Sequence, residues 1–203
     1  MNRRLCIFFI LIVSLLALIV GGCRTPVEPE KQDYVEYGWE LMADTSYRAA
    51  SIQFEAGTEL DRLYADGWNG LGWAYARLDS AGISDTSFST GADLVVDDTS
   101  IVGTEIMAGR SFANLARGEF AEAVDDAKDA LERTPTWEFR RDVTITITYK
   151  HLYLTVATGF YGQGEFDSCL VWVQKLDEDF PADTTLSGRS KLAARLQTLK
   201  GEL

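Results

Sequence analysis

The chain has 203 residues, of which 46% are hydrophobic and 25% are charged. This length suits one domain or one short array of repeats, and the composition excludes a globally disordered protein. The formal net charge is -12 at pH 7. Nucleic acids and anionic lipid surfaces reward lysine and arginine, so the acidic balance argues against nucleic acid as a partner.

The N-terminus has the pattern of an export signal. Arg3 and Arg4 precede an almost wholly apolar run, residues 5–20. This pattern indicates a secretory signal; the alternative is a retained membrane helix, although the run falls a little short of the ~20 residues that a span needs. The run ends in VGGC, which resembles the lipobox of bacterial lipoproteins. That resemblance implies that residues 1–22 are removed as a signal peptide and that the thiol of Cys23 is acylated.

Both interpretations export the bulk of the chain, because the two arginines stay on the cytoplasmic side. A lipid on Cys23 would keep the exported chain at the membrane, since acyl chains add roughly 0.8 kcal/mol per buried CH₂. Residues 23–33 are polar and contain two prolines, which predicts a lipid-anchored flexible tether. We expect a bacterial membrane location that faces the periplasm or the cell exterior. Arg24 slightly favours the outer membrane, because it is not the aspartate associated with inner-membrane retention in some bacteria.

The cysteines agree with this scheme. Cys6 leaves with the signal peptide and Cys23 carries the lipid, so Cys169 remains alone and no intramolecular disulfide is possible. The neighbours of Cys169 in the sequence CLVWV are apolar, which predicts a buried structural thiol rather than a reactive one.

From Tyr34 onward the sequence consists of helix-length amphipathic stretches in pairs. Short polar breaks separate the two members of each pair, at DTS, DTS, RGE and GE. This pattern predicts an all-α repeat protein. The expected pairs are 34–43 with 47–63, 68–78 with 88–96, 105–116 with 120–135, and 151–163 with 166–181.

The pairs share internal markers. Gly38-Trp39 and Gly72-Trp73 lie 34 residues apart, and the Gly-Glu-Phe that begins at Gly118 recurs at Gly164. A helix-turn-helix unit of about this length is the sequence sign of a stacked array.

The markers resemble the tetratricopeptide repeat (TPR), whose pattern is W-x2-L-G-x2-Y, then A-x3-F, then P. The second unit carries the first part in full, although no unit carries the entire pattern. The resemblance covers about residues 34–183, and it implies a right-handed superhelical solenoid of about four repeats over residues 34–184. The matching residues are Trp68, Leu71, Gly72 and Tyr75; Ala50 and Phe54; Tyr153, Val156, Ala157 and Phe160; Ala123; and Pro135 and Pro181.

The glycines inside these helices need an explanation, because glycine is unfavourable there by roughly 1 kcal/mol relative to alanine. We expect Gly38 and Gly72 to lie where the two helices of a repeat approach closely. The TPR pattern does not explain Gly70.

Two segments depart from the repeat. Extra residues in the second unit leave its second helix with two possible registers. Residues 137–150 form an insertion in which Val143, Ile145 and Ile147 alternate with threonines, which is the period of a strand. We favour an extended linker that crosses the array surface; the alternative is an exposed edge that pairs with a partner strand.

The last segment, residues 185–203, predicts a capping helix. Leu192, Leu196, Leu199 and Leu203 share one helical face, and the remainder is charged. The final repeat of an array needs such a cover with a polar outer side.

The sequence offers little for catalysis or cofactors. His151 is the only histidine, which rules out metal sites built on two histidines within one chain, and we expect it to be a packed residue at a helix start. The sequence contains neither a G-x-S-x-G elbow nor a phosphate-binding G-x-x-x-x-G-K. We therefore predict a protein that is not an enzyme and has no metal or cofactor.

Aromatic residues supply the candidate binding site. In the repeat register, three aromatic rings occupy one equivalent position of successive first helices, and a fourth lies about one turn further on. The TPR resemblance implies that this position faces the concave groove, where rigid aromatic rings suit a peptide. The alternative is that the rings only fill space between neighbouring repeats. The candidate residues are Trp39, Trp73, Phe112 and Tyr161, with Asn69 and Arg77 as polar clamps.

The sequence therefore predicts a membrane-anchored scaffold of the bacterial cell envelope that binds an unidentified envelope protein or peptide. One alternative is a structural component of an envelope complex that acts through self-association. Another is a glycan-binding module, which would also use aromatic stacking.

Overall fold

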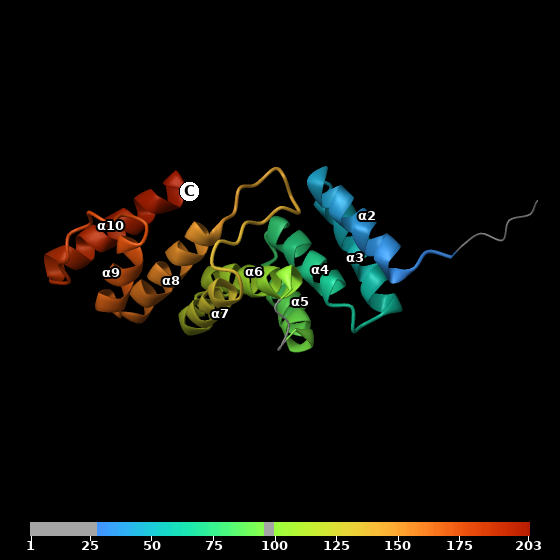
Figure 1. The fold of residues 1–203 in the computed structure, drawn as a ribbon, viewed down its shortest axis with the longest axis horizontal. Helices are drawn as coiled ribbons and strands as arrows, with labels where there is room; N and C mark the ends of the chain where they lie inside the picture. Colours follow the sequence, from blue (N-terminus) through green and yellow to red (C-terminus); the bar gives the residue numbers. More distant parts are fainter. Residues whose placement is uncertain (1–27, 96–99) are drawn as a thin grey trace, which may run out of the picture.

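The computed structural model describes residues 28–95 and 100–203 (Figure 1). The signal segment and Cys23 lie outside the described residues. None of the described helices is long and apolar enough to cross a membrane. The helices are α2 (Lys31–Ala43), α3 (Tyr47–Leu60), α4 (Ala65–Arg77), α5 (Ala81–Leu94), α6 (Ile101–Arg117), α7 (Phe120–Arg133), α8 (Tyr149–Gln163), α9 (Phe166–Gln174) and α10 (Leu186–Glu202).

The helices form a solenoid of four helix pairs, which confirms the predicted all-α repeat fold. Each helix up to α9 packs against the next one in the chain, and the first helices of the pairs (α2, α4, α6 and α8) also contact one another in succession. Among the described residues, the backbones of the second helices do not approach one another in this way, so the first helices line the inner face of the array. Helix α10 contacts α8 and α9 at the C-terminal end (Figure 1).

Glycine ends two of the first helices. Gly118 after α6 and Gly164 after α8 have φ angles of 82° and 80°. Glycine adopts this left-handed conformation without the steric penalty of a side chain, which stops a helix and starts a tight turn. The predicted breaks at RGE and GE are confirmed.

The turn in the second repeat lies at a different position from the one that we expected. We expected the DTS at 85–87 to separate its two helices, but α5 begins at Ala81 and the break lies at Asp79 and Ser80. The DTS residues stay helical because their hydroxyls are satisfied inside the helix: Thr86 donates to the carbonyl of Gly82, and Ser87 donates to that of Ile83, both at 2.9 Å.

Two further helix limits differ from the expected ones. Helix α2 begins at Lys31, so the last three residues expected in the tether are helical. Helix α9 ends at Gln174, well before Pro181, and the chain then turns toward α10.

The phenylalanine of the A-x3-F motif explains the first of the unusual glycines. The Phe54 ring on α3 is fully buried between Gly38 of α2 and Gly70 of α4. A Cβ atom on Gly38 would lie 2.6 Å from this ring, and a Cβ on Gly70 would lie 2.2 Å from it. Both glycines therefore form a socket for one ring, which accounts for Gly70.

The same socket recurs in the next repeat. Phe88 lies 34 residues after Phe54, and its buried ring is flanked by Gly72 of α4 and Gly109 of α6. A Cβ atom would approach the ring to 2.5 Å at Gly72 and to 2.2 Å at Gly109. The close approach that we expected at Gly72 therefore accommodates a side chain rather than a neighbouring backbone.

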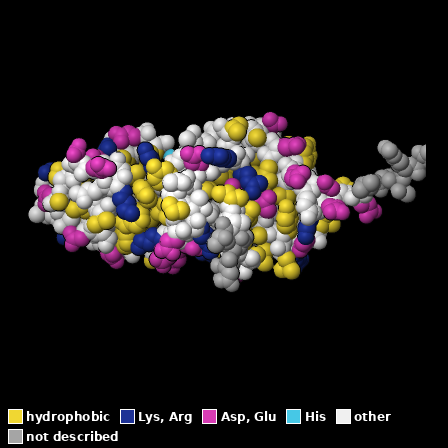
Figure 2. All heavy atoms as spheres, viewed as in Figure 1, with side chains coloured by type: hydrophobic (Ala, Val, Ile, Leu, Met, Phe, Trp, Pro, Cys, Tyr) yellow, Lys and Arg dark blue, Asp and Glu magenta, His cyan; other side chains and the backbone are white. Residues whose placement is uncertain are grey.

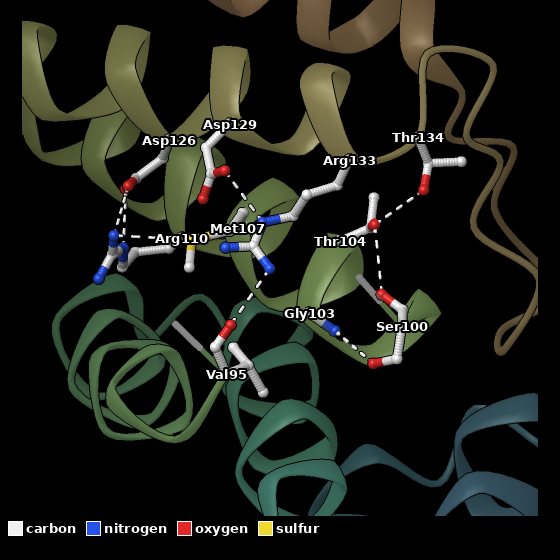
Figure 3. A network of polar contacts seen from close by, with 10 residues as sticks. All are labelled: Val95, Ser100, Gly103, Thr104, Met107, Arg110, Asp126, Asp129, Arg133 and Thr134. Carbon is white, nitrogen blue, oxygen red and sulfur yellow. Dashed lines mark hydrogen bonds and ion pairs between the residues drawn. The ribbon is translucent and has the colours of Figure 1, made fainter. Parts of the chain in front are cut away.

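A polar network fixes α7 to α5 and α6 (Figure 3). Arg110 on α6 pairs with the largely buried Asp126 on α7, with Nε 2.8 Å from a carboxylate oxygen. At the end of α7, Thr134 shares a 2.9 Å hydrogen bond with Thr104 on α6, and Arg133 donates to the carbonyl of Val95 at 3.2 Å. These contacts fix the point where the chain leaves the repeat.

Candidate functional site

The segment between α7 and α8, residues 134–148, folds over the inner face and is called the loop below. In Figure 1 it rises from α7, reaches toward α2 and α4, and returns to α8. Its two arms are joined by hydrogen bonds from the Phe139 amide to the Ile147 carbonyl (2.9 Å) and from the Tyr149 amide to the Trp137 carbonyl (2.7 Å). An isolated bridge pairs the arms, and no strand forms within the described residues.

The loop follows the path expected of an extended linker across the array, but it is buried against the inner face, and it is not the exposed edge of the alternative interpretation. It crosses the array, but Trp137 and Phe139 on it are 1% and 5% exposed. Ile145 and Ile147 pack partly buried against the core, whereas Val143 projects outward and is 81% exposed. Burial of its aromatic residues holds the segment against the helices instead of leaving it free for a partner strand.

Aromatic rings from the loop and the first helices form one cluster. The Phe139 ring stacks on Trp73 with centroids 4.1 Å apart, and it meets Trp39 edge-on at 6.3 Å. Trp137 lies 6.2 Å from Phe139. Trp39 and Trp73 are 8% and 3% exposed. Rings from the helices also bury them, since Trp39 contacts Phe54 and Trp73 contacts Phe88 and Phe112, so the loop completes their burial.

Next to the rings, the side chain of Arg141 on the loop forms ion pairs with two carboxylates. Its guanidinium lies 3.2 Å from Asp66 on α4 and 3.2 Å from Glu105 on α6, and its Cζ lies 4.8 Å above the Trp39 ring. Asn69 donates to Glu105 at 2.7 Å. Burial raises the pKa of Glu105, while Arg141 and Asn69 act in the opposite direction by favouring the carboxylate.

Asp142 makes the last anchor of the loop. Its carboxylate is fully buried, 3.7 Å from Nε of Arg77 and 3.4 Å from the Tyr47 hydroxyl. Arg77 in turn donates to the Tyr47 hydroxyl at 2.7 Å. Asp142 also accepts from the amide of Thr144, which fixes the turn of the loop.

A second region of the inner face stays open beyond the loop. It is a groove of about 550 Å³ between α6, α8 and α10, called the C-terminal groove below. Figure 2 shows a band of hydrophobic atoms where α8 and the C-terminal end of α10 come together. Its walls are mainly apolar, with Lys200 as the charged group at the rim. Its lining residues include Phe112, His151, Tyr161, Leu196, Gln197 and Lys200.

Three solved structures resemble the array. YrrB, described as a TPR protein with an unusual peptide-binding site, is 10% identical with a TM-score of 0.62, over 84% of this chain and 86% of its own. MamA from Desulfovibrio magneticus RS-1 is 11% identical with a TM-score of 0.62, over 86% and 95%. A tetratricopeptide repeat protein from Parabacteroides merdae is 12% identical with a TM-score of 0.55, over 85% and 60%.

The chain has the tetratricopeptide repeat fold. No protein-family model and no curated protein matches its sequence. The fold confirms the resemblance inferred from the repeat markers, and the structure locates the six predicted site residues on its inner face.

The predicted residues divide into two groups on the TPR array. Four of them lie on α2 and α4: Trp39, Trp73 and Arg77 contact the loop, and Asn69 donates to Glu105, which pairs with the loop's Arg141. Phe112 and Tyr161 line the C-terminal groove. Of the four aromatic site residues, the loop therefore covers Trp39 and Trp73, and Phe112 and Tyr161 remain at the open groove.

Sequence reasoning missed the loop's own contribution. Trp137, Phe139, Arg141 and Asp142 all contact the inner face. Glu105 on α6, which pairs with Arg141, was also missed. The available signal was composition, since WEFRRD places two aromatic and four charged residues in a stretch that a simple linker does not require.

Other chemistry has little support among the described residues. They contain no group of three His, Cys, Asp or Glu side chains that could hold a metal ion. Cys169 is fully buried, and burial raises the pKa of its thiol to about 11. The prediction of a buried structural thiol is confirmed, because such a thiol does not form the reactive thiolate near neutral pH.

Proposed function

We propose that this protein is a non-enzymatic scaffold of the bacterial cell envelope that binds a protein segment in the C-terminal groove. We further propose that a lipid on Cys23 holds it at the membrane, on the periplasmic or outer side. The observation that carries the binding proposal is that the loop closes the first half of the concave face and leaves this apolar groove open.

The groove has the features of a segment-binding surface. Its volume of about 550 Å³ and its apolar walls resemble those of binding clefts in general. Phe112 and Tyr161 are half-buried and line the groove, so each ring is held by packing and still offers part of its surface to a ligand. YrrB, which shares the fold, is described as having a peptide-binding site, which supports a peptide ligand here.

The charge at the rim defines the ligand further. Lys200 is exposed at the groove, and burial lowers the pKa of His151, which keeps its ring neutral near pH 7. We propose that the bound segment carries apolar side chains along the groove and a carboxylate opposite Lys200.

A charge reversal with a matched control tests the binding proposal. Tagged full chain is expressed in its own cells, extracted in detergent and compared with Lys200→Glu and Lys191→Glu. Both lysines are exposed on α10, but Lys191 does not line the groove. We expect a captured envelope protein to be lost with Lys200→Glu and retained with Lys191→Glu. Equal capture by both variants would contradict the proposal.

The anchor is tested by the mass of the N-terminus. The lipoprotein proposal predicts that the mature protein begins at Cys23 and carries acyl chains, and that Cys23→Ser abolishes acylation. An unacylated wild-type chain that retains residues 1–22 would instead support the membrane-helix alternative.

A further inference from the structure

The loop contacts the inner face through aromatic stacking and ion pairs, the kinds of contact that a bound peptide makes. The surface it covers is called the N-terminal groove below and consists of Trp39, Asp66, Asn69, Trp73, Arg77 and Glu105. We propose that this groove recognises a protein segment with an aromatic residue followed two positions later by arginine and then aspartate, and that residues 139–142 are a built-in copy that fills it in the free protein. This inference goes beyond the proposed function, because it concerns a different surface.

The aromatic position is specified by ring geometry. Trp73 offers a stacking face to Phe139 at 4.1 Å, and Trp39 offers an edge at 6.3 Å. Stacked and edge-to-face arrangements are both favoured for aromatic pairs, and in the edge-to-face pair the positive ring edge of one meets the negative face of the other. A segment without a ring at this position would leave the two tryptophans without a partner on the groove side.

The arginine position is specified by shape and charge. Asp66 and Glu105 both pair with the guanidinium of Arg141, and Trp39 lies beneath it. A planar guanidinium can contact two carboxylates and stack on a ring at the same time, whereas a lysine ammonium is a compact point charge. The groove is therefore selective for arginine.

The aspartate position completes the pattern. Asp142 lies directly after Arg141 and is held by Arg77 and Tyr47. The groove thus offers negative charge where the segment is positive and positive charge where it is negative, an arrangement that fixes the register of a bound chain.

The contacts that hold the loop in the groove come from side chains. The loop's backbone hydrogen bonds join its own arms, as between Phe139 and Ile147, or join it to the start of α8 through Tyr149. A different segment with the same side chains at the same spacing could make the same groove contacts.

The groove also carries polar atoms that the loop does not use. Oδ1 of Asn69 and Nε1 of Trp73 are buried and have no hydrogen-bond partner among the described residues. Buried polar atoms without partners disfavour the state that contains them. The backbone of an incoming segment supplies both a donor and an acceptor, so another occupant can satisfy the groove better than the loop does.

Tethering explains why the loop fills the groove in the free protein. A ligand on a short connection has an effective concentration on the order of millimolar, so an untethered segment competes only if it binds more tightly or is held nearby. Weakening the loop should therefore expose the groove to a free peptide.

The test uses a fluorescent peptide with the sequence of residues 136–143, TWEFRRDV, titrated into the purified full chain in detergent. The loop-weakened protein is Arg141→Gln, and its matched control is Arg140→Gln. The Arg140 side chain is 82% exposed and pairs with Glu138 in the loop, outside the groove. We expect Arg141→Gln to bind the peptide at least about tenfold more tightly than wild type, because the loop loses its charge anchor and then occupies the groove more weakly at the same effective concentration. Arg140→Gln should match wild type.

A second variant and a second peptide keep the result interpretable. Phe139→Ala combined with Arg141→Gln frees the groove further, and circular dichroism reports whether each protein keeps its helices. A peptide with glutamine in place of its second arginine should bind none of the proteins. If the folded Arg141→Gln protein binds the peptide no more tightly than wild type, the loop is a permanent part of the fold and the proposal is wrong.

Light scattering distinguishes a competing occupant. A dimer that forms by exchange of loops, with no peptide binding by either loop variant, would overturn the proposal, because the groove would then accept only a second copy of this chain. Lys200→Glu should leave peptide binding unchanged, so failure here and failure of the C-terminal groove proposal are separate results.

Discussion

Phe54 and Phe88 determine where this array requires glycine. Each ring sits between two helices of neighbouring repeats, and the space for it exists because the facing residues have no side chain. The helix-propensity cost of glycine is offset by burial of a whole aromatic ring. The same ring therefore joins the helices within a repeat and joins one repeat to the next.

Gly70→Ala should destabilise the protein by about 1–3 kcal/mol, because its Cβ would overlap a ring that packing on both sides prevents from moving. Gly82→Ala is the matched control: Gly82 is helical and faces open space, so alanine should stabilise by up to about 1 kcal/mol. Urea unfolding measures both. A neutral or stabilising Gly70→Ala would show that the socket does not constrain the fold.

His151 makes the fold sensitive to mild acid. Burial lowers its pKa below the ordinary value of 6.5, and its Nδ1 accepts a hydrogen bond from the Thr148 amide at 3.1 Å, which requires an unprotonated nitrogen. Below about pH 6.5 the unfolded chain takes up a proton that the folded chain resists, so stability falls as the pH falls toward the lowered value.

The prediction is a pKa below 6.5 by NMR, where the single histidine gives one titrating ring. His151→Gln keeps an acceptor but does not titrate. The advantage of wild type over this variant in thermal midpoint should therefore shrink between pH 7 and pH 5. An unchanged difference across this range would contradict the assigned burial of the ring.

For single residues, the sequence predicted which ones are buried or lie between helices better than it predicted which residue each one contacts. The 34-residue spacing of Gly38 and Gly72 located both glycines in a helix interface, and the apolar neighbours of Cys169 predicted its burial. Gly70 could not be explained because its partner, Phe54, belongs to the preceding repeat. A contact between repeats leaves no mark in the pattern of a single repeat.

The loop is the element that distinguishes this array from a simple stack of helix pairs. It starts at Thr134, which is tied to α6, and returns to α8 through paired arms. Between these points it places two aromatic rings and an ion pair on α2 and α4. The loop therefore contacts the first helices of the four described repeats and closes the first half of the inner face.

Phe139→Ala should cost about 3 kcal/mol, because it removes a ring that is 5% exposed and stacked on Trp73. Val143→Ala, on the same loop but 81% exposed, should change stability by no more than about 0.5 kcal/mol. Thermal or chemical unfolding compares the two. Similar small effects for both would mean that the loop contributes little to the stability of the array.

Helix limits were predictable where a glycine or a tight turn marks them, as at Gly118 and Gly164. They were not predictable at 85–87, because serine and threonine hydroxyls can bond either inside a helix or in a turn. The alternating residues 143–148 have the period of a strand, but a strand needs a neighbouring strand to pair with, and the other arm of the loop supplies only an isolated bridge.

In the described array, the concave face is divided into two parts. The N-terminal half is filled by the chain's own aromatic and charged side chains, and the C-terminal half remains an open apolar groove between α6, α8 and α10. Repeat spacing predicted the solenoid, since each helix pair repeats local signals. It could not predict this division, because the loop and the groove come together only through contacts between distant parts of the chain.

The most direct test of this division is photo-crosslinking in living cells, with a photoreactive amino acid in place of Gln197. Gln197 is exposed and lines the C-terminal groove, whereas Glu122, exposed on α7, does not line it and serves as the control position. We expect a crosslinked partner protein from position 197 and none from position 122. A partner that crosslinks from position 122 but not from position 197 would contradict the assignment of the C-terminal groove as the binding surface.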